Sequence, residues 1–281
     1  MNIHHLVVIG AGTMGSGIAQ AAATSGYRVT LIDVFPSALE KGLATIQKSV
    51  GKLHEKGRIT DVQKASADRI APAGDYEPAR AADFIIEAAS ENLEVKLAIF
   101  RELDELARRE VILASNTSSI SLTKIGAATR RPDKVAGMHF FNPVPLMSLV
   151  EVIRGAATSD ETAAAVIELA KSMGKTPVEA SDSPGFISNR ILCPMINEAV
   201  FALLEGVGTR EAIDTVMKLG MNHPMGPLEL ADLIGLDVVL SVLRVLHRDL
   251  GEDKYRPCPL LVKMVDAGYL GRKTGRWFYE Y

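Results

Sequence analysis

The stretch Leu6–Asp33, which reads LVVIGAGTMGSGIAQAAATSGYRVTLID, decides the fold. A short apolar run ends in a glycine-rich turn, a segment of small apolar residues follows, and a second apolar run begins after Gly26. This order predicts a strand, a helix and a second strand. The turn Gly10–Gly15 matches the pattern G-x-G-x-x-G, and its place between a strand and a helix favours dinucleotide binding.

Each glycine of this turn has a physical reason. Gly10 allows the tight turn, Gly12 lets the backbone approach a pyrophosphate, and Gly15 lets helix and strand pack closely. The N–H groups at the start of the helix face the phosphates. The loop residues predicted to contact the cofactor are Gly10, Gly12, Thr13, Met14 and Gly15. A glycine turn without a ligand and an FAD site share the pattern and stay open as alternatives.

Asp33 ends the second apolar run, 18 residues after Gly15. A carboxylate there accepts hydrogen bonds from both ribose hydroxyls and repels a 2′-phosphate. The predicted cofactor is therefore NAD in preference to NADP.

Composition limits the remaining classes. The chain has 281 residues, 47% of them hydrophobic and 23% charged, as in an ordinary globular protein. A net charge of -3 argues against nucleic acid or an anionic membrane as the main partner. Five glycines interrupt the uncharged run Leu6–Tyr27, which argues against a membrane span. Cys193 and Cys258 predict free thiols and a cytoplasmic location, and no metal-ligand spacing is present, so no metal is predicted.

Strand-like and helix-like runs alternate through the first part of the chain, which predicts an α/β fold. We expect an N-terminal Rossmann-type doubly wound sheet, mostly parallel, over residues 1–184. An all-α C-terminal domain for substrate binding and dimerisation follows over residues 185–281. Its predicted helices are Phe186–Glu205, Thr209–Leu219, Leu228–Leu250 and Pro259–Ala267. The wide apolar face of the first of these predicts a homodimer through this domain.

One histidine stands out from the other five. His139 lies near the end of the strand-like run Val135–Phe140, and ligands bind at strand carboxyl ends in parallel sheets. Glu151 lies within the apolar run Leu149–Ile153, where a carboxylate needs a partner. An imidazole beside it predicts a general base held by a carboxylate. A structural histidine and a solvent-facing glutamate are the alternatives.

Two further polar positions are candidates. The loop Ser115–Ser119 follows another strand-like run, and Asn189 lies early on the first helix of the second domain, where it can face a cleft between the domains. A helix cap explains the loop equally well, and Asn189 can be an ordinary polar helix residue.

Several motifs together resemble the short-chain L-3-hydroxyacyl-CoA dehydrogenase family, in particular its bacterial 3-hydroxybutyryl-CoA branch. They are VVIGAGTMGSGIAQ, IIEAASENLEVK, ILASNTSSIS, GMHFFNPVPLMSLVEVI, SDSPGFISNRIL, NEAVFALLEGV, HPMGPLELADLIGLD and GRKTGRWFYEY. The resemblance covers essentially the whole chain. Trp277 stands where the family's tail usually has glycine, and Met195 where tyrosine is common.

The resemblance implies roles for single residues. His139 and Glu151 are the catalytic pair, and Ser118 and Asn189 hold the substrate oxygens. Further implied cofactor contacts are Glu91, Lys96, Asn142 and Lys273. Lys52 and Lys56 are implied contacts of the coenzyme A phosphates, with a solvated helix face as the alternative.

The implied reaction is the reversible, NAD-dependent oxidation of (S)-3-hydroxybutyryl-CoA, or a similar short 3-hydroxyacyl-CoA, to the 3-oxoacyl-CoA. Two alternatives remain. One is a dehydrogenase of a free hydroxy acid, of the L-gulonate type. The other is a non-catalytic NAD-binding structural protein.

Overall fold

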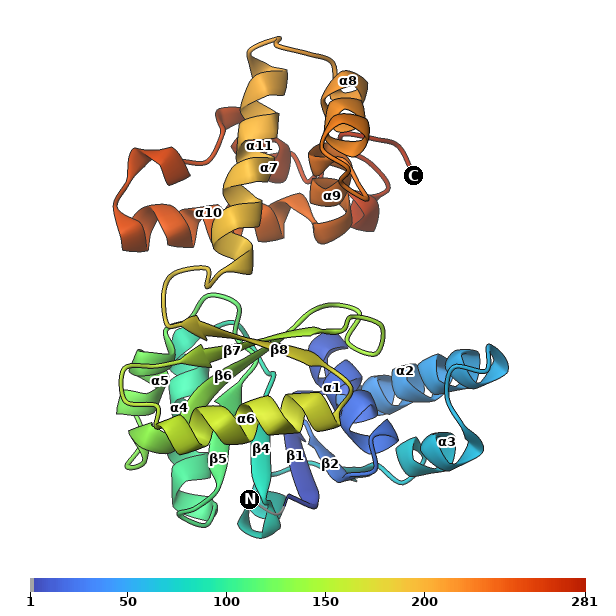
Figure 1. Cartoon of the computed structure of the whole chain (residues 1–281), viewed down its shortest axis with the longest axis vertical. Coiled ribbons are helices and arrows are strands. Elements are labelled where there is room, and N and C mark those ends of the chain that lie inside the picture. Colours follow the sequence, from blue (N-terminus) through green and yellow to red (C-terminus); the bar gives the residue numbers. More distant parts are fainter. Residues whose placement is uncertain (1–2) are drawn as a thin grey trace. The chain divides into compact units, whose positions relative to one another are not determined.

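The computed structural model describes residues 3–281. The chain forms two compact units, one ending at Asp182 and one beginning at Ser183. The first unit is an α/β domain and the second is almost entirely helical (Figure 1), which confirms the predicted fold class. The substrate and dimerisation roles of the second domain stay predictions. No helix within residues 3–281 is long and apolar enough to cross a membrane.

An eight-stranded sheet forms the centre of the first unit. In spatial order its strands are β3 (Ala71–Ala73), β2 (Arg28–Ile32), β1 (His5–Ile9), β4 (Phe84–Glu87), β5 (Ile112–Ser115), β6 (Val135–Phe140), β7 (Leu149–Arg154) and β8 (Thr176–Ser181). The strands from β3 to β6 pair in parallel, β7 pairs antiparallel with β6, and β8 pairs in parallel with β7. The strand order reverses between β1 and β4, which is where doubly wound sheets bind ligands.

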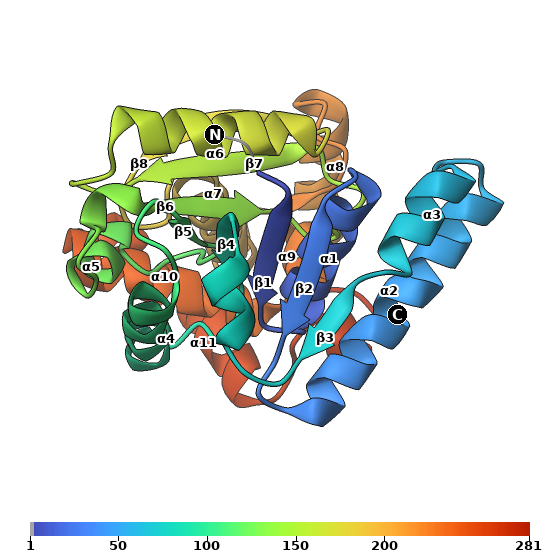
Figure 2. The same ribbon diagram turned by 90° about the horizontal axis from the view of Figure 1, so that it is seen from below.

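Helices cover this sheet. Those of the first unit are α1 (Thr13–Thr24), α2 (Pro36–Glu55), α3 (Asp61–Ala67), α4 (Leu93–Leu106), α5 (Leu122–Ala127) and α6 (Asp160–Ser172), with the 3-10 turns η1 (Glu77–Ala81) and η2 (Pro132–Lys134). Helix α1 packs on β1 and β2, and α6 packs on β6, β7 and β8. Helices α2 and α3 lie together against α1, beyond the β3 edge of the sheet (Figure 2). Consecutive residues such as Val7 and Val8 are both fully buried, so both faces of the sheet are covered.

The second unit packs its helices around one apolar core. Its elements are α7 (Ser188–Leu204), α8 (Arg210–Thr215), a π-helical turn η3 (Val216–Gly220), α9 (Pro227–Ile234), α10 (Leu236–Leu250), η4 (Asp253–Tyr255), α11 (Pro259–Asp266) and η5 (Arg272–Thr274). The prediction of one helix over Leu228–Leu250 is wrong. Gly235 has a φ of 103°, which no continuous helix accommodates, and it separates α9 from α10.

The C-terminal segment contains Trp277, which stands where the family usually has glycine. Trp277 stacks on Tyr269 with ring centroids 5.7 Å apart, so its indole covers that ring. The Asp232 carboxylate accepts hydrogen bonds from the backbone N–H groups of Phe278 and Tyr279 and fixes the chain that follows.

Candidate active site

The glycine-rich turn has the room that a bound phosphate group needs. A Cβ atom added to Gly15 would lie 1.7 Å from the carbonyl oxygen of Gly10, so this position requires glycine for packing. A Cβ added to Gly12 would meet no atom within 4 Å, so this glycine borders open space. No side chain caps the N-terminus of α1, and its first turn has no acidic residue. The N–H groups there suit an anion, as the predicted pyrophosphate contact requires.

A pocket of about 510 Å³ lies beside this turn and is lined in part by Gly10, Gly12 and Asp33. The Asp33 carboxylate accepts hydrogen bonds from the N–H groups of Ala11, at 2.8 Å, and Phe35, at 3.0 Å. Three other polar residues also line the pocket: Tyr76, Ser90 and Glu102. Burial raises the pKa of Tyr76, and the negative charges of Glu102 and Asp33 raise it further. This negative field disfavours a 2′-phosphate and supports the expected preference for NAD.

The histidine and glutamate singled out in the sequence face each other across two strands. The antiparallel register of β6 and β7 pairs His139 directly with Glu151, which places both side chains on one face of the sheet. His139 Nδ1 lies 2.8 Å from Glu151 Oε2, and the two residues are 6% and 2% exposed. A solvent-facing glutamate does not fit this geometry, and the catalytic role of the pair stays a prediction.

Ser118 lies on the other side of the imidazole. Its hydroxyl oxygen is 3.2 Å from His139 Nε2, so the three side chains form a continuous series from Ser118 to Glu151. Because a carboxylate only accepts hydrogen bonds, the neutral imidazole carries its proton on Nδ1. Nε2 is then the basic nitrogen, and it faces the hydroxyl group.

The loop that carries Ser118 is fixed at both ends. Asn116 Oδ1 accepts a hydrogen bond of 2.8 Å from the N–H of Phe140, which ties the loop to the end of β6. The Asp182 carboxylate accepts hydrogen bonds from the Ser121 hydroxyl and the N–H groups of Leu122 and Thr123. The alternative of a helix cap applies to Ser121, which caps α5, and not to Ser118.

Glu91 and Lys96 are both expected to contact the cofactor, but they differ in burial and in the groups that they bind. Glu91 has a half-exposed side chain, and its carboxylate binds the segment Thr117–Ser119. Lys96 is 1% exposed, and its ammonium group donates to both carboxylate oxygens of Glu87 at 2.8 Å. Direct contact of Lys96 with a cofactor stays a prediction, and its burial favours a supporting role.

Glu87 is a site residue that sequence reasoning missed. This fully buried carboxylate, the last residue of β4, also accepts hydrogen bonds from the Ser115 hydroxyl at 2.7 Å and the N–H of Ala89 at 2.8 Å. The available signal was a glutamate at the end of the apolar run FIIE, which needs a buried partner just as Glu151 does.

The other predicted contacts lie on several elements. Lys52 on α2 and Lys56 just after it are exposed, and exposed Asn142 follows β6 by two residues. In the second unit, Asn189 lies in the first turn of α7, and Lys273 Nζ lies 2.6 Å from Asp237 Oδ1. Their roles stay predictions.

The turn after Asn142 is fixed by a lysine. Lys175 Nζ donates hydrogen bonds to the carbonyl oxygens of Val144, at 2.6 Å, and Met147, at 2.8 Å. Burial lowers the pKa of Lys175. The carbonyl oxygens therefore hold a partly desolvated ammonium group against the turn.

Both cysteines are buried free thiols, as predicted. Burial raises the pKa of Cys193 to about 12, so this sulfur is protonated and inert near neutral pH. Within residues 3–281, no group of three or more His, Cys, Asp or Glu side chains is arranged to hold a metal ion.

Comparison with known proteins places the chain in a family. Residues 5–183 match the NAD-binding domain of 3-hydroxyacyl-CoA dehydrogenase, and residues 185–281 match its C-terminal domain. A probable 3-hydroxybutyryl-CoA dehydrogenase of Bacillus subtilis is 56% identical over 100% of this chain and 98% of its own length. A 3-hydroxybutyryl-CoA dehydrogenase of Clostridioides difficile is 53% identical over 98% of this chain and 99% of its own.

A solved structure gives the same result. The crystal structure of (S)-3-hydroxybutyryl-CoA dehydrogenase from Ralstonia eutropha matches with a TM-score of 0.96 and 53% identity, over 100% of this chain and 99% of the other. The chain therefore belongs to the 3-hydroxyacyl-CoA dehydrogenase family. The predicted family, the oxidoreductase class and NAD as the cofactor are confirmed.

Proposed function

We propose that this protein catalyses the reversible, NAD-dependent oxidation of (S)-3-hydroxybutyryl-CoA, or a similar short 3-hydroxyacyl-CoA, to the 3-oxoacyl-CoA. The observation that carries the proposal is the buried pair of His139 and Glu151, 2.8 Å apart, with the Ser118 hydroxyl 3.2 Å from the other ring nitrogen. The names of the full-length relatives support the substrate class.

In the oxidising direction, His139 Nε2 takes the proton of the substrate hydroxyl as a general base. Glu151 holds the ring in the tautomer that leaves this nitrogen basic, and its negative charge stabilises the imidazolium that forms. Ser118, together with Asn189, orients the substrate oxygen. In the reducing direction, the same nitrogen returns the proton.

The residues that would hold NAD are those of the glycine turn and Asp33. The uncapped N-terminus of α1 would hold the pyrophosphate, and Asp33 would accept hydrogen bonds from the ribose hydroxyls. When bound, NAD supplies the acceptor for the hydride that leaves C3. We assign Lys273, Asn142 and Glu91 as further contacts of NAD, and Lys52 and Lys56 as contacts of the coenzyme A phosphates.

The test follows NADH absorbance with acetoacetyl-CoA as the substrate. We expect turnover with NADH well above that with NADPH. We also expect kcat/KM for acetoacetyl-CoA to exceed that for free acetoacetate by on the order of 100-fold, because the coenzyme A portion supplies binding energy to the reaction. Absence of NADH-dependent turnover with acyl-CoA thioesters from C4 to C16 would refute the proposal.

A second candidate is an enzyme that acts on a substrate without coenzyme A. Two solved structures motivate it: a diketoreductase, 29% identical over all of this chain, and a dehydrogenase of a pyridine carboxylic acid, 32% identical over all of it. Reduction of NAD, followed by the same absorbance with L-gulonate, free 3-hydroxybutyrate or (S)-3-hydroxybutyryl-CoA as the substrate, distinguishes the two. A kcat/KM for either free acid above that for the thioester would favour the second candidate.

We further propose that the protein is a cytoplasmic homodimer. Unpaired buried thiols at Cys193 and Cys258 support a reducing compartment. Support for the dimer comes from the second unit, where a pocket of about 500 Å³ with an almost wholly apolar lining opens beside α7 and α8.

A further inference from the structure

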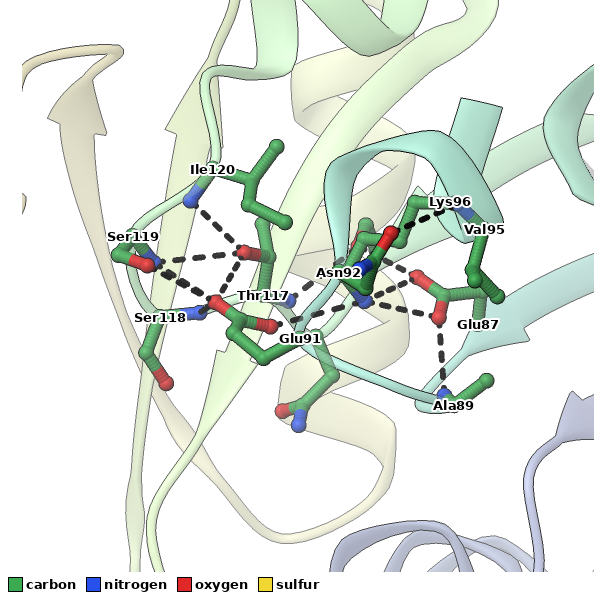
Figure 3. A network of polar contacts seen from close by, with 12 residues as sticks. Glu87, Ala89, Glu91, Asn92, Val95, Lys96, Thr117, Ser118, Ser119 and Ile120 are labelled. Carbon is green, nitrogen blue, oxygen red and sulfur yellow. Dashed lines mark hydrogen bonds and ion pairs between the residues drawn. The ribbon is translucent and has the colours of Figure 1, made fainter. Parts of the chain in front are cut away.

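We propose that the buried pair of Glu87 and Lys96 is a positioning device for the Ser118 hydroxyl, acting through Glu91. This inference rests on the proposed function, because it assigns the network a purpose in aligning the reacting oxygen. The network spans three segments of the first unit: the end of β4 with the turn that follows it, the first turn of α4, and the end of β5 with the loop after it (Figure 3).

The first step is the pair itself. Glu87 is 0% exposed and Lys96 is 1% exposed, so both groups are almost fully removed from water. Charges buried to this degree are tolerated only when paired and hydrogen-bonded. Both oxygens of Glu87 accept from Lys96 Nζ at 2.8 Å, and each accepts one further hydrogen bond, from Ala89 N–H or the Ser115 hydroxyl. The ammonium group is therefore held at a fixed point.

The second step leads from the ammonium group to Glu91. Glu91 Oε2 lies 3.7 Å from Lys96 Nζ, within the distance of an ion pair whose ammonium side is buried. The side chain of Glu91 is otherwise 45% exposed, so its own burial does not fix it. Outside the loop after β5, Lys96 is therefore the charged group that holds this carboxylate.

The third step leads from Glu91 to the loop. Glu91 Oε1 lies within hydrogen-bond distance of four donors: the Thr117 hydroxyl at 2.6 Å, Ser118 N–H at 3.0 Å, and both the N–H and the hydroxyl of Ser119 at 3.1 Å. Figure 3 shows this oxygen inside the curve of the loop. Holding Ser118 by its backbone N–H sets where its hydroxyl stands relative to His139 Nε2.

The same network touches the glycine turn. Glu87 fixes the N–H of Ala89, and a Cβ added to Gly10 would lie 2.5 Å from the carbonyl oxygen of Ala88 and 2.9 Å from Ala89 Cα. The Glu87 carboxylate therefore has two effects. It holds the segment Ala88–Ala89 against the glycine turn, and through Lys96 and Glu91 it holds the loop that carries Ser118.

The test compares Lys96→Met with a matched control on the same helix. Asp104 on α4 is 6% exposed and pairs with Arg131 at 2.7 Å, away from the Ser118 loop, so Asp104→Asn also breaks a buried ion pair. In Lys96→Met we expect kcat to fall about 10- to 100-fold with KM and the Kd for NAD within about threefold, because misplacing a reacting group lowers turnover more than affinity. Asp104→Asn is expected to lower Tm while leaving kcat unchanged.

A second readout does not depend on activity. We expect hydrogen exchange at the Ser118 and Ser119 amides to speed up about tenfold or more in Lys96→Met, because these N–H groups lose a fixed acceptor. Their exchange in Asp104→Asn stays as in the wild type. If Lys96→Met fails to fold, Glu91→Ala, at a half-exposed side chain, is expected to give the same faster exchange.

The double variant Glu87→Gln/Lys96→Met distinguishes positioning from simple stability. Replacing both charges of a buried pair restores much of the stability lost on removing one, and a glutamine retains acceptor and donor atoms for Ala89 and Ser115. We expect Tm to recover and kcat to stay low, since Glu91 still lacks its anchor.

Three results overturn the proposal: unchanged amide exchange in Lys96→Met, recovery of kcat in the double variant, or a Kd for NAD raised tenfold with kcat unchanged. The last result would make Lys96 a direct cofactor contact. If the wild type turns over no acyl-CoA, the proposed function fails, and the amide exchange alone decides whether the network positions the loop.

Discussion

His139 and Glu151 meet because the antiparallel register of β6 and β7 places them opposite each other. In an antiparallel pair a shift of one residue would turn Glu151 to the opposite face of the sheet and leave a buried carboxylate without its imidazole partner. The register is therefore under chemical as well as steric control. Ser118 reaches the same imidazole from a loop that Glu91, Asn116 and Asp182 hold by hydrogen bonds.

Substitutions of His139 and Glu151 give the prediction at the residue scale. His139→Gln removes the base, and Glu151→Gln removes the charge that stabilises the imidazolium, so each is expected to lower kcat by about 10²- to 10⁴-fold. Steady-state rates with acetoacetyl-CoA and NADH measure the change, and calorimetric titration with NAD is the control, since the glycine turn and Asp33 are untouched. A rate within threefold of the wild type in either variant would remove that residue from the mechanism.

At the scale of elements, periodic apolar runs predicted the inner strands well. The predicted run Val135–Phe140 coincides with β6, and the run Leu149–Ile153 lies within β7. Edge strands were missed: β3 has three residues, and most of the side chains of β8 are partly or fully exposed. Such strands carry little apolar signal, because the sheet's backbone hydrogen bonds, rather than buried side chains, place them.

The sequence also predicted only part of the candidate site. His139 and Asp33 could be chosen from the sequence because His139 lies near the carboxyl end of an apolar strand and Asp33 directly follows another. The contact between Glu87 and Lys96 could not be predicted from the sequence. It joins the end of a strand to a helix residue nine positions later, and it depends on how α4 packs. The burial of Lys96 could not be predicted from the sequence either, because lysine is rarely buried without a partner.

The break between α9 and α10 gives a prediction at this scale. Gly235→Ala places a Cβ at a φ of 103° and 2.5 Å from Lys273 Cε, so we expect it to lower the stability of the second unit by about 1–3 kcal/mol. Gly51→Ala is the matched substitution inside α2, where a Cβ meets nothing within 4 Å, and it is expected to add about 0.4–1 kcal/mol. Calorimetric scans of both variants measure the two effects, and equal shifts in Tm would contradict the conformational argument.

At the scale of the whole molecule, apolar exposure is uneven along the chain. Several large apolar side chains after residue 200 are more than half exposed: Val207 (76%), Val216 (58%), Leu219 (82%) and Met221 (61%). Val207 and Val216 also line the apolar pocket beside α7 and α8. Apolar surface gathered around a pocket in this way is characteristic of an interface, which is the reason for placing the proposed dimer on the second unit.

Sedimentation velocity tests this assignment. The wild type is expected to sediment at twice the chain mass of 30.2 kDa, and Val216→Asp to shift it toward the monomer, because an unpaired carboxylate in an apolar interface loses its hydration. Val62→Asp is the control: Val62 is 74% exposed on α3 of the first unit, and its replacement should leave the mass unchanged. A wild type that remains at the monomer mass at micromolar concentration rules out the dimer. Dissociation by Val62→Asp but not by Val216→Asp would instead move the interface to the first unit.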